Sequence, residues 1–270
     1  MIKSFFFIPG NHPKLSEKIE TISSEYFIID LEESIQPEET LSAITHLSGV
    51  KKNRNNIFVR PSLFKENNDI DVLKTLSEAG FLNWVIPKLR NLKQLQKIES
   101  LIAELDLSNV KVILLIENPQ SFFSLQQILQ QIKLNVVAIG FGSQDFCTET
   151  GMSHTREVLL HPRFIVSGIA KAFGIQAIDI ACMEIENSEI ITGEIKDAQA
   201  LNFDAKFFIH PKQLDVLNIF NENITFELNE AKKILEEYEK RGRPRIFVYN
   251  GKAVEPPHIR DFQNKLNQLK

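Results

Sequence analysis

The chain has 270 residues, 43% of them apolar, which is enough to fill the core of one large domain or two small ones. Its net charge is −4 and its acidic and basic residues are interspersed, so no basic face indicates nucleic acid and no polybasic run indicates a membrane surface. Two cysteines, Cys147 and Cys182, are too few for a disulfide framework and form no CxxC pair. Because both lie beside apolar runs, we expect buried, unreactive thiols.

The first ten residues, MIKSFFFIPG, contain a short apolar run that Pro9 and Gly10 close. This run is shorter than the hydrophobic region of a signal peptide, so it is interpreted as a first strand. No window approaches ~18 consecutive apolar residues, the length that a membrane-spanning helix needs. We therefore expect a soluble, cytoplasmic protein.

Eight short apolar runs alternate with amphipathic stretches along most of the chain. They are continuous and not alternating, which is typical of parallel strands covered by helices. Eight strand–helix units favour a (β/α)8 TIM barrel over an open doubly wound sheet, and no GxGxxG motif follows any run. The runs are SFFFIP (4–9), YFIID (26–30), NIFVR (56–60), WVIPK (84–88), VKVILLIE (110–117), VVAIGFG (136–142), QAIDIAC (176–182) and KFFIHP (206–211).

A C-terminal extension follows the eighth run. Residues 227–242 form a charged amphipathic pattern that predicts a helix, and Asn250–Gly251 between two short apolar runs predicts a type I′ hairpin. A last helix is predicted around 256–269. We therefore divide the chain into a catalytic barrel, 1–225, and a helix–hairpin–helix extension, 226–270, which we expect to pack on the barrel or on a neighbouring subunit.

Ionisable residues cluster where the predicted strands end, which is where barrel enzymes carry their chemistry. Glu117 and Asp145 follow adjacent strands, and two carboxylates without a nearby histidine or cysteine suit Mg²⁺. The alternative is a pair of solvated acids, or an acid paired with Lys88 or Arg60. The other residues at these ends are Asp30, Glu32, Glu33 and His210.

Arg60 is a planar, permanently charged group that suits a carboxylate or a developing enolate oxygen. An ion pair with Glu32 or Glu33 is the alternative. Asp179 lies within the predicted seventh strand and is interpreted as structural, whereas His210 is either a buried, satisfied histidine or a site residue.

Eight motifs occur in an order and spacing that resemble the citrate lyase beta subunit and its relatives, the HpcH/HpaI aldolase family. The resemblance spans essentially the whole chain. It implies a (β/α)8 barrel, Mg²⁺, a homotrimer, and carbon–carbon bond cleavage or formation next to a carbonyl in acyl-CoA substrates such as citryl-, malyl- or citramalyl-CoA. The motifs are IPG (8–10), DLEE (30–33), VRPS (59–62), IPK (86–88), LIEN (115–118), GFGSQD (140–145), AKAFGIQAID (170–179) and NFDAKFFIHPKQ (202–213).

The resemblance also implies roles for single residues. Glu117 and Asp145 are the expected metal ligands, and Arg60 contacts the substrate near its thioester or carboxylate. In close relatives an acid after the C-terminal hairpin reaches a neighbouring subunit's active site, and Glu255 stands at that position. Glu32 and Lys88 are the further expected substrate-binding residues.

Several positions depart from the family pattern. The lysine and arginine that the family has after its second strand are Thr40 and Ile44 here, which removes two positive charges expected near an acyl-CoA. Lys3 replaces an arginine, Gln144 stands where GSED has its glutamate, VRPS replaces VRVN, and the tail acid is Glu255 where the family has aspartate. These departures affect the anion-binding residues more than the metal pair.

The leading hypothesis is a Mg²⁺-dependent lyase that performs retro-aldol or retro-Claisen cleavage of a 3-hydroxyacyl-CoA, with Arg60 stabilising the enolate and Glu255 as acid/base. One alternative is a class II aldolase acting on a free hydroxy-keto acid, which the loss of charge at Thr40 and Ile44 favours. The other is a non-catalytic paralogue that binds an acidic metabolite or a partner protein.

Overall fold

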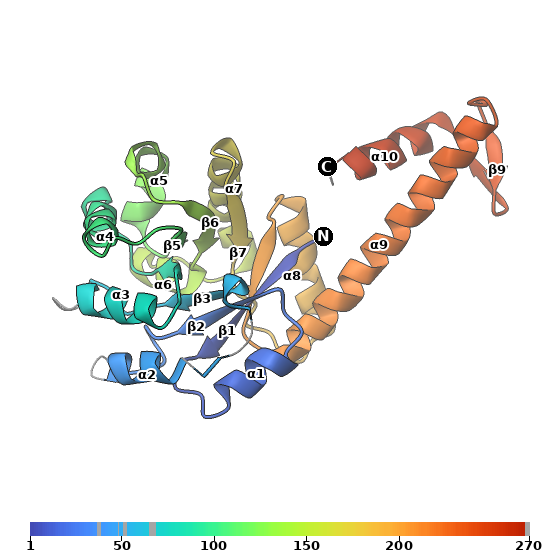
Figure 1. The fold of residues 1–270 in the computed structure, drawn as a ribbon. Helices are drawn as coiled ribbons and strands as arrows, with labels where there is room; N and C mark the ends of the chain where they lie inside the picture. The colour runs from blue at the N-terminus through green and yellow to red at the C-terminus, as the bar shows by residue number, and fades with distance from the viewer. Residues whose placement is uncertain (37–38, 48, 51–52, 65–68, 268–270) are drawn as a thin grey trace. The chain divides into compact units, whose positions relative to one another are not determined.

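The computed structural model describes residues 1–270 apart from 37–38, 48, 51–52, 65–68 and 268–270 (Figure 1). Eight parallel strands close into a barrel in chain order, with β8 pairing back onto β1. The expected (β/α)8 fold is thus confirmed. The strands are β1 (Lys3–Pro9), β2 (Tyr26–Asp30), β3 (Ile57–Arg60), β4 (Asn83–Ile86), β5 (Lys111–Ile116), β6 (Val136–Phe141), β7 (Gln176–Asp179) and β8 (Ala205–Phe208).

The barrel interior is filled by side chains from every strand, as the continuous apolar runs require. Large aromatic residues dominate one side of it: the rings of Phe5 and Tyr26 stack at 4.5 Å between centroids, and Phe207 meets Phe5 edge-on at 6.5 Å. Smaller residues such as Ala138 and Ala205 also belong to this core. The interior is therefore a packed core, and a ligand can enter only at an end of the barrel.

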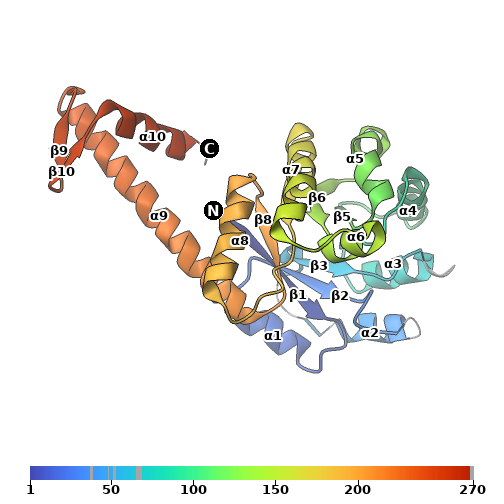
Figure 2. The same ribbon diagram turned by 180° about the vertical axis from the view of Figure 1, so that it is seen from behind.

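Helices lie outside the strands, as the two opposite views show (Figures 1 and 2). Asn118 caps α5 by accepting a 2.9 Å hydrogen bond from the Ser121 N–H, and Pro119 takes the first helical position. This cap ends β5 directly after Glu117. The helices are α1 (Leu15–Thr21), α2 (Thr40–Leu47), α3 (Asp69–Glu78), α4 (Leu92–Glu104), α5 (Pro119–Gln131), α6 (Ser143–Thr150), α7 (Arg156–Ala172) and α8 (Ser188–Ala200), with a short 3-10 helix at Arg54–Asn56.

The chain divides into two compact units, residues 2–214 and residues 215–270 together with Met1. The second unit contains most of α9 (Pro211–Lys240), the antiparallel pair β9 (Phe247–Tyr249) and β10 (Lys252–Val254), and α10 (Pro256–Asn267). A small apolar cluster holds it together, formed by Phe247, Val254 and Ile259 with partly buried side chains of α9. The division of function between a catalytic barrel, 1–225, and an extension, 226–270, stays a prediction.

The hairpin and helices of the extension differ in how well the sequence predicts them. Asn250 and Gly251 both have positive φ, 47° and 76°, which confirms the type I′ turn. The predicted helix 227–242 is instead the second half of one continuous helix that begins at Pro211, because no glycine or proline interrupts 212–240. Residues 268–269 of the predicted last helix lie outside the described residues. Among the described residues, no helix is long and apolar enough to cross a membrane.

Candidate active site

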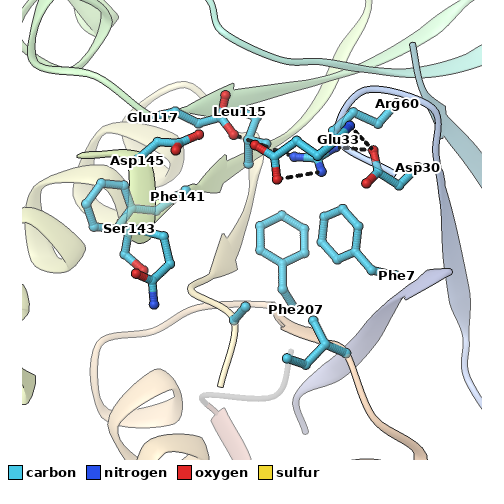
Figure 3. Close-up of a pocket in the computed structure, with 14 residues that line it drawn as sticks. Phe7, Asp30, Glu33, Arg60, Leu115, Glu117, Phe141, Ser143, Asp145 and Phe207 are labelled. Atoms are coloured by element: carbon cyan, nitrogen blue, oxygen red, sulfur yellow. Dashed lines mark hydrogen bonds and ion pairs between the residues drawn. The ribbon is translucent and has the colours of Figure 1, made fainter. Parts of the chain in front are cut away.

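A cavity of about 260 Å³ opens at the carboxyl ends of the barrel strands (Figure 3). The ends of β2 and β3 and the segments after β5 and β6 contribute its polar groups, whereas the rings of Phe7, Phe141 and Phe207 form apolar walls. A few convergent charges in an otherwise apolar cleft are typical of a small-molecule site. The remaining lining residues are Asp30, Glu33, Arg60, Leu115, Glu117, Gly142, Ser143, Gln144, Asp145, Ala181 and Ile209.

Arg60 is the fixed cation of this cavity. Its side chain is only 9% exposed, its Nε donates a 2.8 Å hydrogen bond to Asp30 Oδ1, and its guanidinium lies over the Phe7 ring at 5.2 Å. Burial opposes its charge, but the surrounding carboxylates outweigh burial and raise its pKa. Three further carboxylates lie within 4 Å of its terminal nitrogens: Glu33 at 3.6 Å, Glu117 at 3.7 Å and Glu32 at 3.8 Å.

Glu117 is a buried carboxylate held from two sides. It is 3% exposed, and its Oε2 accepts a 2.8 Å hydrogen bond from the backbone N–H of Lys88. Lys88 presents that N–H because its backbone has φ 51°, a left-handed conformation that is uncommon for lysine and typical of functional sites. Burial raises the pKa of Glu117 to about 7, although Lys88 and Arg60 pull it down.

Gly142 allows Glu117 to reach the cavity. A Cβ on residue 142 would lie 2.4 Å from Glu117 Cγ, so any larger residue would collide with the acid. The Gly142 N–H also donates a 2.8 Å hydrogen bond to the carbonyl of Ile116, which ties the end of β6 to the end of β5. The glycine thus fixes the distance between the two strand ends that carry the acids.

Asp145 lies in the first turn of α6, directly after β6, and its side chain is 36% exposed. A carboxylate is favourable there because the N-terminal end of a helix carries partial positive charge. Lys88 Nζ pairs with Asp145 Oδ2 and, at 3.2 Å, with Glu33 Oε1. Burial opposes the Lys88 charge, but the bond to Asp145 and the nearby acids raise the pKa of Lys88 overall.

The donor set at this mouth fits a hard divalent cation. Glu117 and Asp145 both line the cavity, and both offer only oxygen atoms. Magnesium accepts one or two protein carboxylates and completes its octahedron with water and substrate oxygens. Among the described residues, no group of three or more histidine, cysteine or acidic side chains is arranged to hold a metal.

The other residues predicted for the site have different positions. Glu32 is 4% exposed beneath Arg60 and is not among the described lining side chains; its role in substrate binding stays a prediction. Glu255 is exposed at the start of α10, where its N–H donates to His258 Nδ1 at 3.1 Å, and its catalytic role also stays a prediction. His210 contacts the segment that starts α9, where its ring nitrogen accepts a hydrogen bond from the Lys212 N–H at 3.3 Å.

Asp179 is structural, as expected. It is fully buried and accepts two 2.8 Å hydrogen bonds from Arg163, while Lys206 Nζ lies 3.2 Å from its Oδ2. Arg163 and Lys206 escaped sequence analysis because a single charge on a helix or strand gives no sign of its buried partner. Cys147 and Cys182 are buried and free, as predicted, and burial raises the pKa of both thiols.

Ser143 is a lining residue that sequence reasoning did not single out, although it lies within the motif GFGSQD. It is 4% exposed, and its hydroxyl lies 2.9 Å from His154 Nε2. The histidine sits eleven positions further along, after α6, so no local spacing indicates the pair. Either group can be the donor in this hydrogen bond.

Thr40 and Ile44, the two positions where the family pattern has basic residues, are both buried in α2 (2% and 0% exposed). The sequence from 34 to 50 contains neither lysine nor arginine. This segment after β2 therefore has no lysine or arginine to contact a phosphate.

Comparisons with known proteins agree on one family. The family model of HpcH/HpaI aldolase/citrate lyase matches residues 3–211. Human mitochondrial citramalyl-CoA lyase is 22% identical over 97% of this chain and 84% of its own length, and the citrate lyase subunit beta of Leuconostoc mesenteroides is 23% identical over 95% and 89%. A crystal structure of CitE from Mycobacterium tuberculosis with magnesium, acetoacetate and coenzyme A has a TM-score of 0.75 at 22% identity, covering 99% of this chain and 97% of that one.

Proposed function

Because the chain belongs to the HpcH/HpaI aldolase/citrate lyase family of carbon–carbon lyases, we propose that its barrel mouth cleaves a 3-hydroxyacyl compound by a retro-aldol or retro-Claisen reaction. The observation that supports this most is the convergence of Glu117, Asp145 and Arg60 on one cavity. Two acids and a fixed cation provide what the reaction needs: a place for a divalent metal and a positive group where negative charge develops.

Glu117 and Asp145 are the residues that would hold Mg²⁺. Bound there, Mg²⁺ supplies a Lewis acid for the carboxylate and hydroxyl of the fragment that becomes the keto acid. Gly142 and the Lys88 N–H keep Glu117 at the cavity wall, so the Glu117 carboxylate is positioned before any substrate binds.

Arg60 stabilises the other fragment. When a base removes the hydroxyl proton, the O–H electrons form the new carbonyl, and the electrons of the broken carbon–carbon bond move onto the α-carbon and its carbonyl oxygen as an enolate. Arg60 donates to that oxygen without reorganising, because Asp30 and the buried Glu32 already hold its guanidinium in place. A proton then returns to the α-carbon to complete the balance.

Glu255 of a neighbouring subunit is the proposed acid/base, in a homotrimer. Mixing two inactive variants tests this assignment. Glu117→Gln and Glu255→Gln are each expected to be inactive alone, and trimers that contain subunits of both variants are expected to regain part of the activity. Light scattering on the same samples reports the mass of the assembly. Mixtures that stay inactive, in assemblies shown to exchange subunits, would exclude a Glu255 that acts across an interface.

A CoA thioester such as citryl-, malyl- or citramalyl-CoA is the proposed substrate. The names of the relatives support it, because human citramalyl-CoA lyase aligns over 97% of this chain. A free hydroxy-keto acid is the second candidate, and the burial of Thr40 and Ile44, with no lysine or arginine from 34 to 50, favours it. Lys88, with its partly exposed ammonium, is the proposed contact for a substrate carboxylate in either case.

Matched variants test the proposed reaction. We expect Glu117→Gln and Asp145→Asn to lower cleavage of whichever substrate is used by about a hundredfold or more. Glu149→Gln, on the same helix as Asp145 but paired with Arg90 outside the cavity, is the control and should keep full activity. Assays of both substrate classes with Mg²⁺ and with a chelator separate the two candidates. Full activity in Glu117→Gln would refute the metal-assisted lyase.

A further inference from the structure

Lys88 is the one described residue that contacts both acids proposed to hold the metal, and it contacts them with different groups. Its backbone N–H bonds Glu117 Oε2 at 2.8 Å, and its ammonium pairs with Asp145 Oδ2. The ammonium therefore occupies one of the two carboxylate oxygens of Asp145. The lysine itself is not among the described lining residues, so it reaches the acid from the rim of the cavity.

The two cations of the site differ in freedom. The Arg60 side chain is 9% exposed and its guanidinium is held in place by four acids: Asp30, Glu32, Glu33 and Glu117. The Lys88 side chain is 32% exposed, and an ammonium on a flexible four-carbon stem can move without disturbing the barrel. A second acid is already within reach, because Glu33 Oε1 lies 3.2 Å from Nζ and is itself half-exposed.

We propose that Lys88 is the resident cation of the metal-free site and competes with the divalent metal for Asp145, and that Glu33 receives its ammonium when the metal binds. The proposal rests on the proposed function, since it needs Glu117 and Asp145 to be the metal ligands. The physical reason is repulsion: an ammonium and Mg²⁺ on the same carboxylate lie within a few ångströms of each other, and like charges at that distance repel strongly in a partly buried site.

Competition has a consequence for the charge of the site. Five carboxylates, Asp30, Glu32, Glu33, Glu117 and Asp145, surround two cations, Arg60 and Lys88. Without Lys88, Asp145 would lose the ammonium that pairs with it, and among the described residues Glu33 would keep only Arg60, at 3.6 Å. The lysine thus stabilises the metal-free protein and lowers its affinity for the metal. After exchange its charge remains beside Glu33, where it can contact an anionic substrate.

Calorimetric titration of the full-length, metal-free protein with MgCl₂ tests the proposal. Lys88→Met removes the charge but keeps an unbranched side chain of nearly the same length and the backbone N–H, and we expect it to bind Mg²⁺ about tenfold more tightly or better than the unmodified protein. Lys88→Arg keeps the charge and should bind no more tightly than the unmodified protein. Lys14→Met, which removes a surface lysine paired with Glu17, is the control for net charge and should leave the affinity unchanged.

Glu33→Gln tests the receiving partner. Removing this acid should weaken Mg²⁺ binding more in the unmodified protein than in the Lys88→Met background, because only a lysine that moves needs somewhere to go. Equal weakening in both backgrounds would show that Glu33 acts by its charge alone and would contradict its assigned role. Circular dichroism of each variant verifies the fold.

The outcomes separate this inference from the function on which it rests. If the unmodified protein binds Mg²⁺ and Lys88→Met binds it equally or less tightly, the competition is refuted and the metal site stands. If neither the unmodified protein nor Lys88→Met binds Mg²⁺, the metal site itself is refuted, and this inference with it. Tighter binding by Lys88→Met together with loss of binding in Glu117→Gln supports both.

Discussion

Gly142 lies so close to Glu117 that a Cβ on residue 142 would fall 2.4 Å from Glu117 Cγ and 3.1 Å from its Oε1. Glycine is therefore needed here to leave space for Glu117. It is not needed for its backbone conformation, because a φ of −89° is open to any residue. Two strand ends, β5 and β6, come together here, and the smallest side chain leaves the space that the carboxylate fills.

Gly142→Ala should displace Glu117 from the cavity wall and weaken Mg²⁺ binding by about tenfold or more, since a ligand moved by even 1 Å loses its geometry. Titration with MgCl₂ measures the change. Gly168→Ala is the matched control: nothing lies within 4 Å of a Cβ at this position in α7, and alanine should stabilise the helix by about 0.5–1 kcal/mol. Unchanged Mg²⁺ affinity in Gly142→Ala would show that Glu117 does not depend on this contact.

Arg60→Lys should reduce turnover far more than it reduces stability. Lysine keeps the positive charge, but it has a single nitrogen where Arg60 uses Nε for Asp30 and its two terminal nitrogens for three other acids. We expect kcat to fall by about a hundredfold, while the thermal midpoint changes by a few degrees. A kcat close to that of the unmodified enzyme would mean that charge alone, and not the guanidinium geometry, stabilises the enolate.

The cluster of Arg163, Asp179 and Lys206 predicts a large stability effect remote from the chemistry. Arg163→Ala leaves Asp179 buried with one cation in place of two, and breaking a buried pair from one side costs about 3–5 kcal/mol. Urea denaturation measures the free energy of unfolding. Arg243→Ala, which breaks an exposed pair with Glu239, is the control and should leave stability nearly unchanged. A similarly small effect at Arg163 would contradict the assigned role of this cluster.

The sequence predicts those site residues that lie at the ends of the barrel strands. A closed parallel barrel brings the carboxyl ends of all its strands to one rim, so Glu117, Asp145 and Arg60 could be expected to meet once eight runs were counted. The register supports the same logic, since Asp30 and Arg60 are partners across β2 and β3.

Other features depend on contacts that no local pattern contains. The left-handed backbone of Lys88, which turns its N–H to Glu117, comes from how the end of β4 meets β5, and a lysine gives no sign of positive φ. Ser143 and His154 are joined across a helix, and Arg163 becomes buried only because Asp179 lies opposite. The predicted helix 227–242 covers only the second half of α9, because the predicted barrel domain extends to residue 225, within this helix.

The raised pKa of Glu117, about 7 in the metal-free protein, predicts how Mg²⁺ affinity depends on pH. Magnesium binds the ionised carboxylate, so below pH 7 each binding event releases a proton and the affinity should fall about tenfold per pH unit. Above pH 7 the affinity should level off. Titrations in two buffers of different ionisation enthalpy report the released proton directly, and a pH-independent affinity between pH 5.5 and 7 would contradict the shift.

The same group sets the sign of a stability effect. The folded pKa lies above the usual value of 4.5, so between pH 4.5 and 7 the metal-free folded state binds more protons than the unfolded state, and its stability falls as pH rises through this window. We expect this loss of stability to be on the order of 3 kcal/mol and to be complete above pH 7. Glu117→Gln should remove this slope, and saturating Mg²⁺ should also remove it, because the metal keeps the folded Glu117 ionised across the window. Denaturation curves across pH 4.5 to 8 measure this slope for the metal-free protein, the variant and the magnesium-saturated protein. If the stability of the metal-free protein rises across this window, the raised pKa of Glu117 is refuted.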